Sequence, residues 1–233
     1  MAPTTPGDIK WIPLESNPEV INAMLSKLGV DPTFGFSDVW GLDDELLSMV
    51  VQPVKAIVFL FPLTPKYEAE RKEEIASSSH RVSPSVWFMR QTIGNACGTM
   101  AVIHSLANNQ GDIQVGGYLG KFLSRVADMT PEQRAEVLEG DAVIAGAHLE
   151  SASAGQTAAP QPEEDVELHF ISFVSVDGDL YELDGRQPAP FNHGPSTDLL
   201  KDAARVIKKR IQSFEGGTQE FTVLSLGLHP NLQ

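Results

Sequence analysis

The chain has 233 residues, an ordinary globular composition and an excess of acidic side chains, with 17 Lys and Arg against 31 Asp and Glu. The hydrophobic content of 42% excludes an intrinsically disordered chain. The formal net charge of −14 disfavours nucleic acid and anionic membranes as partners and favours a basic protein. The single cysteine excludes an internal disulfide and a cysteine-rich zinc site.

The sequence contains no segment with the pattern of a secretion signal or a membrane span. Residues 1–8 have neither a basic nor an apolar stretch, so we expect no signal peptide. The longest apolar run, residues 57–63, is far shorter than the roughly 20 residues that span a bilayer. We therefore expect a protein of the reducing cytoplasm with no membrane partner, and we expect it to be a monomer.

In the N-terminal half, the clearest helix signal lies over residues 17–29. Asn17 is a good N-cap, Pro18 fits the first helical position and Gly29 can end the helix. The apolar residues between them recur at helical spacing, as on a helix with one buried face. The pattern predicts three further elements here, namely a helix over 43–50, a buried strand over 54–61 and a charged, exposed helix over 66–76.

Further along the chain, residues 95–107 are apolar almost all round, which predicts a buried central helix. Residues 151–165 lack a hydrophobic period and contain two prolines and an acidic run, as expected of a linker or a functional lid. The remaining predicted elements are helices over 117–127, 131–138 and 196–214, and strands over 166–176, 180–183 and 220–226. A buried helix that precedes most of the strands predicts an α/β or α+β fold.

The cysteine is the first candidate functional residue. With Asn95 as N-cap, Cys97 lies in the first turn of its helix, where unpaired N–H groups and the helix dipole stabilise a thiolate. Gly94 and Gly98 flank it and leave room for another backbone to approach. Gln91, six residues upstream, is near enough to present its amide beside the sulfur, where it and the Cys97 N–H could hold an oxyanion. Taken singly, the cysteine also fits a small buried hydrophobe and the glutamine a capping or surface amide.

A base for this thiol must come from elsewhere in the chain. His104 is seven residues further along the same helix, about 10.5 Å away at the backbone, so it cannot touch the sulfur. The neighbourhoods of His148, His229 and His80 predict solvated side chains. His169 differs because it lies inside a predicted strand, where it is a candidate base or a hydrogen-bonded core histidine.

A hairpin supplies the carboxylate that would orient this histidine. Its turn at the Asp-Gly pair 177–178 places Asp184 opposite Ile171, so that His169 lies on the same face. Asp184 and His169 are then diagonal neighbours about 7–8 Å apart at the backbone, within side-chain reach. Glu182 shares the face but is a further step away. The register therefore selects Asp184 as the orienting residue, although a surface turn aspartate would fit the same position.

Three segments that contain these residues resemble the catalytic blocks of the ubiquitin C-terminal hydrolases, a family of deubiquitinating cysteine peptidases. They are Gln91-Thr-Ile-Gly-Asn-Ala-Cys97-Gly-Thr, Leu168-His169-Phe-Ile and Leu180-Tyr-Glu-Leu-Asp184-Gly-Arg. Residues 11–19, 44–49 and 192–194 are similar to the short, single-domain members. The separated motifs occur in the family's order and cover nearly the whole chain.

The resemblance implies a fold and catalytic roles. The fold is one catalytic domain over 1–233, papain-like, with helices on both sides of a central, mainly antiparallel sheet and a knotted backbone. The implied roles are listed here: Cys97 as nucleophile, His169 as general base and acid, Asp184 as the residue that orients His169, and Gln91 as oxyanion donor. No metal and no organic cofactor is implied.

The resemblance also implies how substrate is bound. Residues from about 148 to 165 correspond to the family's crossover loop, which arches over the active site and favours small adducts and short peptide extensions. The acidic residues that match those gripping basic ubiquitin are Glu15, Glu19 and Asp38. The modifier NEDD8 is a second candidate substrate.

The sequence therefore predicts a thiol hydrolase that cleaves adducts from the C-terminal glycine of ubiquitin through a Cys97 thioester. Two alternatives stay open. One is a ubiquitin-binding protein that keeps the fold but does not turn over. The other is a papain-like peptidase of broader specificity, since Gln and Cys six residues apart also suit that mechanism.

Overall fold

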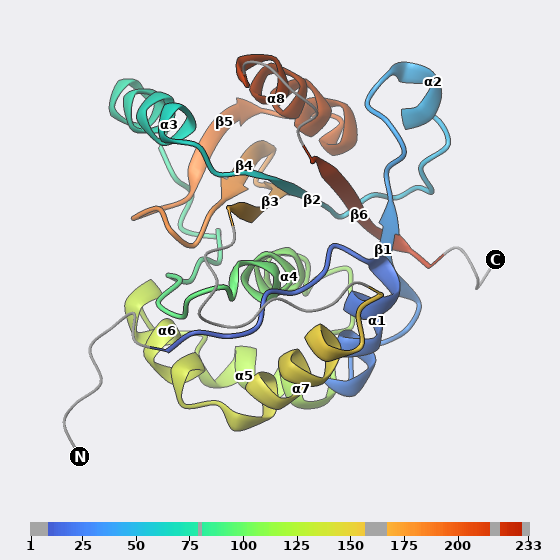
Figure 1. Ribbon diagram of the computed structural model, residues 1–233, viewed down its shortest axis with the longest axis vertical. Coiled ribbons are helices and arrows are strands. Elements are labelled where there is room, and N and C mark those ends of the chain that lie inside the picture. The colour runs from blue at the N-terminus through green and yellow to red at the C-terminus, as the bar shows by residue number, and fades with distance from the viewer. Residues whose placement is uncertain (1–8, 79–80, 157–166, 215–219, 230–233) are drawn as a thin grey trace.

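The computed structural model describes residues 9–78, 81–156, 167–214 and 220–229, which form one six-stranded sheet with helices on both faces (Figure 1). Each neighbouring pair of strands is antiparallel, and the strand order is β1-β6-β2-β3-β4-β5. The strands are β1 (Phe34–Asp38), β2 (Ala56–Pro62), β3 (Leu168–Val176), β4 (Asp179–Leu183), β5 (Phe191–Pro195) and β6 (Thr222–Leu228). The predicted α+β class with a mainly antiparallel sheet is confirmed.

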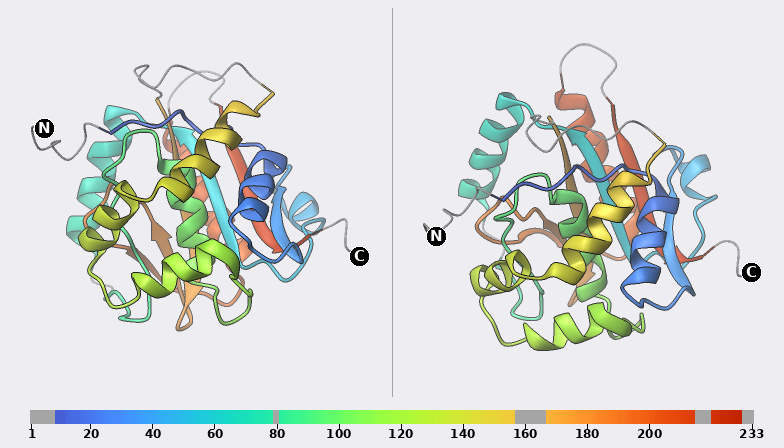
Figure 2. Two further views of the ribbon diagram at one scale, coloured as in Figure 1. Left: turned by 90° about the horizontal axis from the view of Figure 1, so that it is seen from below. Right: turned by 60° about the horizontal axis from the view of Figure 1, so that its bottom comes forward.

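The helices form a layer on each side of the sheet (Figures 1 and 2). The larger layer contains α1 (Pro18–Lys27), α4 (Cys97–Ala107), α5 (Gly117–Arg125), α6 (Pro131–Glu139) and α7 (Ala142–Ser153). The other side carries α2 (Asp44–Leu47), α3 (Pro65–Ser77) and α8 (Leu199–Ser213). None of the helices within the described ranges is long and apolar enough to cross a bilayer.

Strand β2 shows why its sequence is apolar at every position. Alternate side chains point to opposite faces, so Phe59 and Phe61 pack towards α8 while Val58 and Leu60 pack towards α4. All four are buried. Full burial of side chains of this size stabilises the fold by roughly 1.5–3 kcal/mol each. The two hydrophobic cores therefore share this strand, which holds the two helical layers in one unit.

Helix α4 is the central helix that the sequence predicts, and its residues from Gly98 to Ala107 are all buried. Its start differs from the prediction, because the N-cap is Ala96 and no side chain caps the helix. Asn95 instead adopts a left-handed conformation with φ of 61°, which asparagine tolerates better than most residues. Its side-chain amide donates to the carbonyl of Trp11 at 3.1 Å. Cys97 is thus the first helical residue of an uncapped N-terminus.

An extended N-terminal segment, residues 9–14, crosses the start of α4 (Figures 1 and 2). The Trp11 N–H donates to the carbonyl of Gly94 at 2.9 Å. Further along, a Cβ added to Gly98 would lie only 3.1 Å from the Cβ of Leu14. The close approach that the flanking glycines predict is therefore made by this segment.

Three elements were not expected from the sequence: β1, β5 and α7. Helix α7 extends to Ser153, so the stretch predicted to be structureless from Ser151, and the crossover loop predicted from about 148, begin later than expected. Much of that loop, residues 157–166, lies outside the described residues.

Helix α3 is exposed as predicted over most of its length, but Tyr67 and Arg71 are buried. The other predicted elements are present with shifted ends.

Candidate active site

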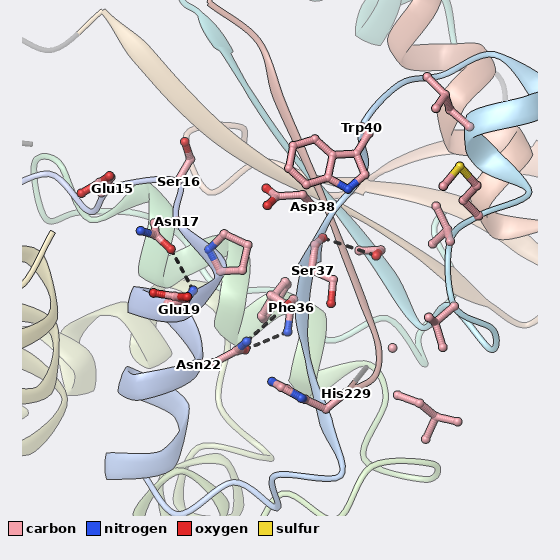
Figure 3. Close-up of a pocket in the computed structure, with 18 of the residues that line it drawn as sticks. Glu15, Ser16, Asn17, Glu19, Asn22, Phe36, Ser37, Asp38, Trp40 and His229 are labelled. Atoms are coloured by element: carbon pink, nitrogen blue, oxygen red, sulfur yellow. Dashed lines mark hydrogen bonds between the residues drawn. The ribbon is translucent and has the colours of Figure 1, made fainter. Parts of the chain in front are cut away.

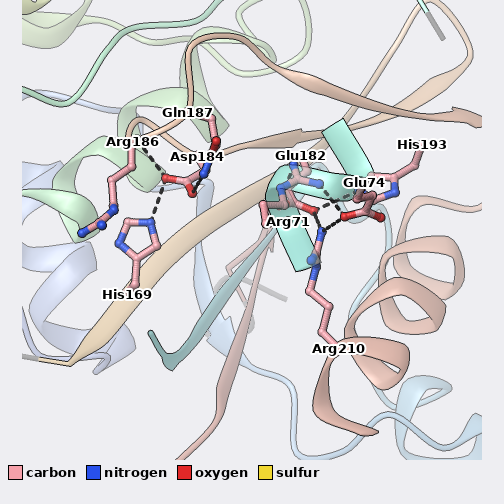
Figure 4. A network of polar contacts seen from close by, with 9 residues as sticks. All are labelled: Arg71, Glu74, His169, Glu182, Asp184, Arg186, Gln187, His193 and Arg210. Atoms are coloured by element: carbon pink, nitrogen blue, oxygen red, sulfur yellow. Dashed lines mark hydrogen bonds and ion pairs between the residues drawn. The ribbon is translucent and has the colours of Figure 1, made fainter. Parts of the chain in front are cut away.

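Three of the predicted site residues meet at one place although they come from three elements. Cys97 begins α4, His169 lies in β3, and Asp184 directly follows β4. The Nε2 atom of His169 lies 2.8 Å from Oδ1 of Asp184 (Figure 4). The thiol of Cys97 forms a hydrogen bond with the same imidazole. Asp184 and His169 are each less than 5% exposed, so the hydrogen bond between them is shielded from water, whereas Cys97 is partly exposed.

The hairpin register accounts for the contact between His169 and Asp184. Ser172 pairs with Leu183 and Phe173 with Glu182, which is the register that the Asp-Gly turn predicts. Asp184 is therefore one diagonal step from His169 on the same face. Its Oδ1 also accepts the backbone N–H of Arg186 at 2.9 Å, which fixes the carboxylate.

The electrostatics of the trio favour an ion pair. Burial by itself would lower the pKa of His169, but the charge and hydrogen bond of Asp184, followed by those of Cys97, raise it to about 10. Burial opposes ionisation of the Cys97 thiol, yet the hydrogen bond and charge of His169 lower its pKa below the ordinary value of 9.0. Backbone N–H groups of Phe170 and Gly98 act in the same direction. Both shifts favour a thiolate that faces an imidazolium over the neutral pair.

Gln91 is held beside this trio by the loop that follows Asp184. Its backbone N–H donates to the carbonyl of Gly185 at 2.8 Å. Its side-chain amide donates to the carbonyl of Ile93 at 3.1 Å, and Oε1 is buried with no partner among the described residues. An amide has two N–H groups, so the second remains for a ligand.

The three acidic residues expected to bind a basic partner line one groove of about 700 Å³ between α1 and β1 (Figure 3). Asp38 lies across the groove from Glu15 and Glu19. Partial burial raises the pKa of Asp38, and no described side chain pairs with it. Glu15 differs, because its Oε2 accepts the backbone N–H of Gln156 at 2.7 Å. The rim carries two exposed apolar side chains, Trp40 at 80% and Met49 at 69%.

Two histidines expected to be solvated are not, and one cannot be placed. His148 is 1% exposed, with hydrogen bonds to Thr99 and to the carbonyl of Ile12, because the unexpected helix α7 packs it into the core. His229 is half-buried and lines the groove. His80 lies outside the described residues. Their sequence neighbourhoods gave no signal of this, since burial of both depends on elements distant in the chain.

A buried ionic cluster beside the trio was also missed. Glu182, the second carboxylate on the face of Asp184, is 1% exposed and is paired with Arg71, Arg210 and His193 (Figure 4). Burial opposes its ionisation, but the charges of Arg210 and Arg71 hold its pKa well below the usual value. Its own partners thus hold Glu182 away from His169. The presence of a glutamate within a predicted strand was the only sequence signal that could have indicated such a cluster.

A thiol at the start of a buried helix, hydrogen-bonded to an imidazole that a carboxylate orients, is the arrangement of the papain-like cysteine peptidases. In the described part of the chain, no group of three or more His, Cys, Asp or Glu side chains could hold a metal ion. The fold and this site therefore define a cysteine peptidase.

Comparison with known proteins narrows this class. Residues 11–212 match the profile of the family described as ubiquitin carboxyl-terminal hydrolase, family 1. The chain belongs to this family and is a deubiquitinating thiol hydrolase. Ubiquitin carboxyl-terminal hydrolase 3 of Arabidopsis thaliana is 45% identical over 223 residues, which cover 93% of this chain and 94% of that protein. Isozyme L1 of Homo sapiens is 45% identical over 219 residues, or 92% and 96% of the two chains.

A solved structure supports the fold. The catalytic domain of Trichinella spiralis UCH37, bound to ubiquitin vinyl methyl ester, superimposes with a TM-score of 0.77. The match covers 96% of this chain and 97% of that one at 24% sequence identity. The papain-like arrangement expected from the sequence is therefore the fold of the protein.

Proposed function

We propose that Cys97, His169, Asp184 and Gln91 carry out thioester-mediated hydrolysis at the C-terminal glycine of ubiquitin. The observation that carries this assignment is the contact of Cys97 with His169 and of His169 with Asp184. The Cys97 thiolate attacks the carbonyl carbon of the terminal glycine. The uncapped N-terminus of α4 supplies the Cys97 N–H to the resulting oxyanion, and the second amide N–H of Gln91 supplies another donor.

The proton of His169 then leaves with the product. The imidazolium gives its proton to the departing amine or thiol as the bond to the glycine carbonyl breaks, which leaves a thioester on Cys97. Neutral His169 next takes a proton from water, and the hydroxide formed attacks the thioester. Ubiquitin is released and the thiolate returns. Throughout, Asp184 holds the ring orientation and stabilises the imidazolium.

The groove between α1 and β1 is proposed to bind the basic surface of ubiquitin. Asp38 supports this because it is a partly buried carboxylate to which no described side chain is paired, and burial of such a group favours a cationic partner. Glu19 adds a second carboxylate on the opposite wall. Glu15 lines the same groove, where its Oε2 accepts the backbone N–H of Gln156. The exposed ring of Trp40 offers apolar contact area beside these charges.

Four further points belong to the same proposal. The first is that NEDD8 is a second substrate, and the second is that the adducts cleaved are small molecules or short, flexible peptides. The third is that the protein acts as a monomer without membrane or nucleic-acid partners. The fourth is that it works in the cytoplasm. The net charge of −14 supports the choice of basic protein partners over polyanions. The reducing environment of the cytoplasm would keep a lone thiol active.

The experiment compares wild type with Cys97→Ala on fluorogenic C-terminal amides of ubiquitin and NEDD8, with unfolded casein as a third substrate. We expect turnover of ubiquitin amide by wild type, none by Cys97→Ala, and no cleavage of casein. Equal rates for wild type and Cys97→Ala would exclude Cys97 as nucleophile. Tight ubiquitin binding without turnover would identify a binding protein, and cleavage of casein as readily as ubiquitin amide would identify a general peptidase.

A further inference from the structure

His148, which the mechanism above does not use, connects three parts of the molecule around α4. Its Nε2 lies 2.7 Å from the carbonyl oxygen of Ile12 in the N-terminal segment. Its Nδ1 lies 2.7 Å from the hydroxyl of Thr99, two residues beyond the nucleophile. The ring of Trp11 packs against it with the centroids 4.4 Å apart. A single buried ring thus joins α7, α4 and the segment of residues 9–14.

The two hydrogen bonds fix the protonation of the ring. A carbonyl oxygen only accepts, so Nε2 of His148 carries a proton and donates to Ile12. Burial outweighs this hydrogen bond and lowers the pKa of His148 to about 4, so the ring is neutral at physiological pH. Nδ1 then accepts from the Thr99 hydroxyl. The imidazole therefore has one tautomer and one orientation.

The segment that His148 holds contacts the chain immediately before the nucleophile. Gly94 accepts the Trp11 N–H at 2.9 Å, and the side chain of Asn95 donates to the Trp11 carbonyl at 3.1 Å. Asn95 has φ of 61°, a conformation that costs energy for a residue other than glycine. Its side-chain bond to the segment helps to hold that conformation, and Asn95 lies two residues before Cys97.

The same segment also contacts the helix just after the nucleophile. Leu14 packs on Gly98, where a Cβ would be 3.1 Å from the Cβ of Leu14. The start of α4 has no side-chain cap of its own, since Ala96 cannot provide one. Residues 9–14 therefore bracket Cys97 and take the place of a cap in fixing the first turn.

We propose that His148 is a positioning residue, whose hydrogen bond to Ile12 holds residues 9–14 against α4 and thereby sets the sulfur of Cys97 against His169. The inference rests on the proposed function, for which it adds a residue that touches neither substrate nor the reacting atoms. Misplacement of a reacting group by about 1 Å lowers rates by on the order of a hundredfold, so a modest shift of the segment has a large effect.

Two polar replacements separate the two hydrogen bonds of the ring. A glutamine amide reaches the position of Nε2, so His148→Gln keeps a donor for Ile12, whereas His148→Asn reaches only the position of Nδ1 and keeps the contact with Thr99. We expect kcat on ubiquitin amide to stay within about threefold of wild type for His148→Gln and to fall about tenfold or more for His148→Asn. Thr99→Val, which removes the other hydrogen bond, should keep kcat within about threefold.

A second readout does not use ubiquitin. The rate of Cys97 alkylation by iodoacetamide, followed against pH, reports the ionisation of the thiol. We expect the apparent pKa of Cys97 to rise in His148→Asn, because the sulfur moves away from His169, and to be unchanged in His148→Gln and Thr99→Val. All variants are compared at a temperature at which thermal denaturation shows them fully folded.

The outcomes separate this inference from the proposed function. Equal kcat and equal alkylation profiles for His148→Gln and His148→Asn would overturn the inference, because a purely structural histidine moves only the melting temperature. A loss of kcat in Thr99→Val would also overturn it, and this variant decides the matter if His148→Asn does not fold. A wild-type chain without ubiquitin amidase activity would refute the proposed function while leaving the alkylation comparison valid.

Discussion

The backbone N–H of Gln91 donates to the carbonyl of Gly185 at 2.8 Å, which joins the proposed oxyanion donor directly to the loop that follows Asp184. A Cβ added to Gly185 would lie 2.8 Å from the Cβ of Gln91 and 3.2 Å from its backbone nitrogen. Two segments more than 90 residues apart in the chain thus meet at a backbone contact that requires glycine. The position of Gln91 depends on this contact.

Gly185→Ala is therefore expected to lower kcat by about ten- to a hundredfold, because it displaces Gln91 from the oxyanion while Cys97, His169 and Asp184 remain. The KM for ubiquitin amide should change little, since the groove is not affected. Steady-state kinetics measure both. Gly146→Ala is a matched control, because a Cβ added there meets nothing within 4 Å. A Gly185→Ala variant with wild-type kcat would show that Gln91 does not bind the oxyanion.

The pH dependence of kcat/KM should follow the ion pair of Cys97 and His169. The value of kcat/KM should rise with pH as the Cys97 thiol ionises, with a pKa lower than its ordinary 9.0. It should fall again as His169 loses its proton, with a pKa of about 10. The charge and hydrogen bond of Asp184 raise the pKa of His169 against the effect of burial. Asp184→Asn should therefore move the alkaline limb to lower pH and also lower kcat. Asp177→Asn, a change at the hairpin turn, serves as control and should leave both limbs in place. An unmoved alkaline limb in Asp184→Asn would assign that limb to another group.

The core of the site was predictable because a local signal sets it. The Asp-Gly turn fixes the β3–β4 register, and with it the diagonal relation of His169 to Asp184. The position of Cys97 at the start of a buried helix was predictable for a similar reason, since an apolar run needs a beginning. The prediction that Asn95 is the N-cap was wrong, because its side chain bonds to Trp11 instead. Trp11 lies more than 80 positions earlier in the chain, and no local rule reveals such a contact.

The elements that were not predicted lack a local sequence pattern of a helix or strand. Helix α7 is built largely from small and apolar residues, so no polar face marks it as a helix, and the same lack of pattern hid the burial of His148. Strand β1 contains Gly35, and β5 contains Gly194 and Pro195, which weaken a strand signal. Strand β1 forms by pairing with β6, nearly 190 residues later. Tertiary pairing rather than propensity decides such segments.

Neutralising Asp38 is expected to weaken substrate binding and leave the chemistry intact. Asp38→Asn removes the partly buried carboxylate that faces the groove without a described partner, so KM for ubiquitin amide should rise several-fold, consistent with about 1 kcal/mol for one charge pair. Added salt should raise the KM of wild type more than that of the variant. Glu132→Gln, at the exposed start of α6, is the control. A fall in kcat with unchanged KM would place Asp38 in the catalytic machinery instead.

The Glu182 cluster makes a prediction about stability. Arg71 and Glu182 lie 3.0 Å apart, with side chains almost fully buried. Arg71→Met leaves a buried carboxylate with fewer cations and should lower the free energy of unfolding by about 3–5 kcal/mol. Adding Glu182→Gln removes that carboxylate, while Arg210 keeps Glu74 as a partner at 3.3 Å. The double variant should therefore lose less stability than the sum of the two single changes.

The acid stability of these variants tests the same cluster. Because the folded pKa of Glu182 is well below 4.5, the cluster stabilises the native state fully above that pH, and this stabilisation is lost as the pH falls below it. Urea denaturation at neutral and acid pH should show a steeper acid loss for wild type than for Arg71→Met/Glu182→Gln. Strictly additive losses at neutral pH would show that Glu182 and Arg71 act independently, with Arg210 or His193 as the stabilising partner of the carboxylate. Parallel acid profiles would contradict the prediction itself, because they would show that no partner lowers the pKa of Glu182 in the folded state.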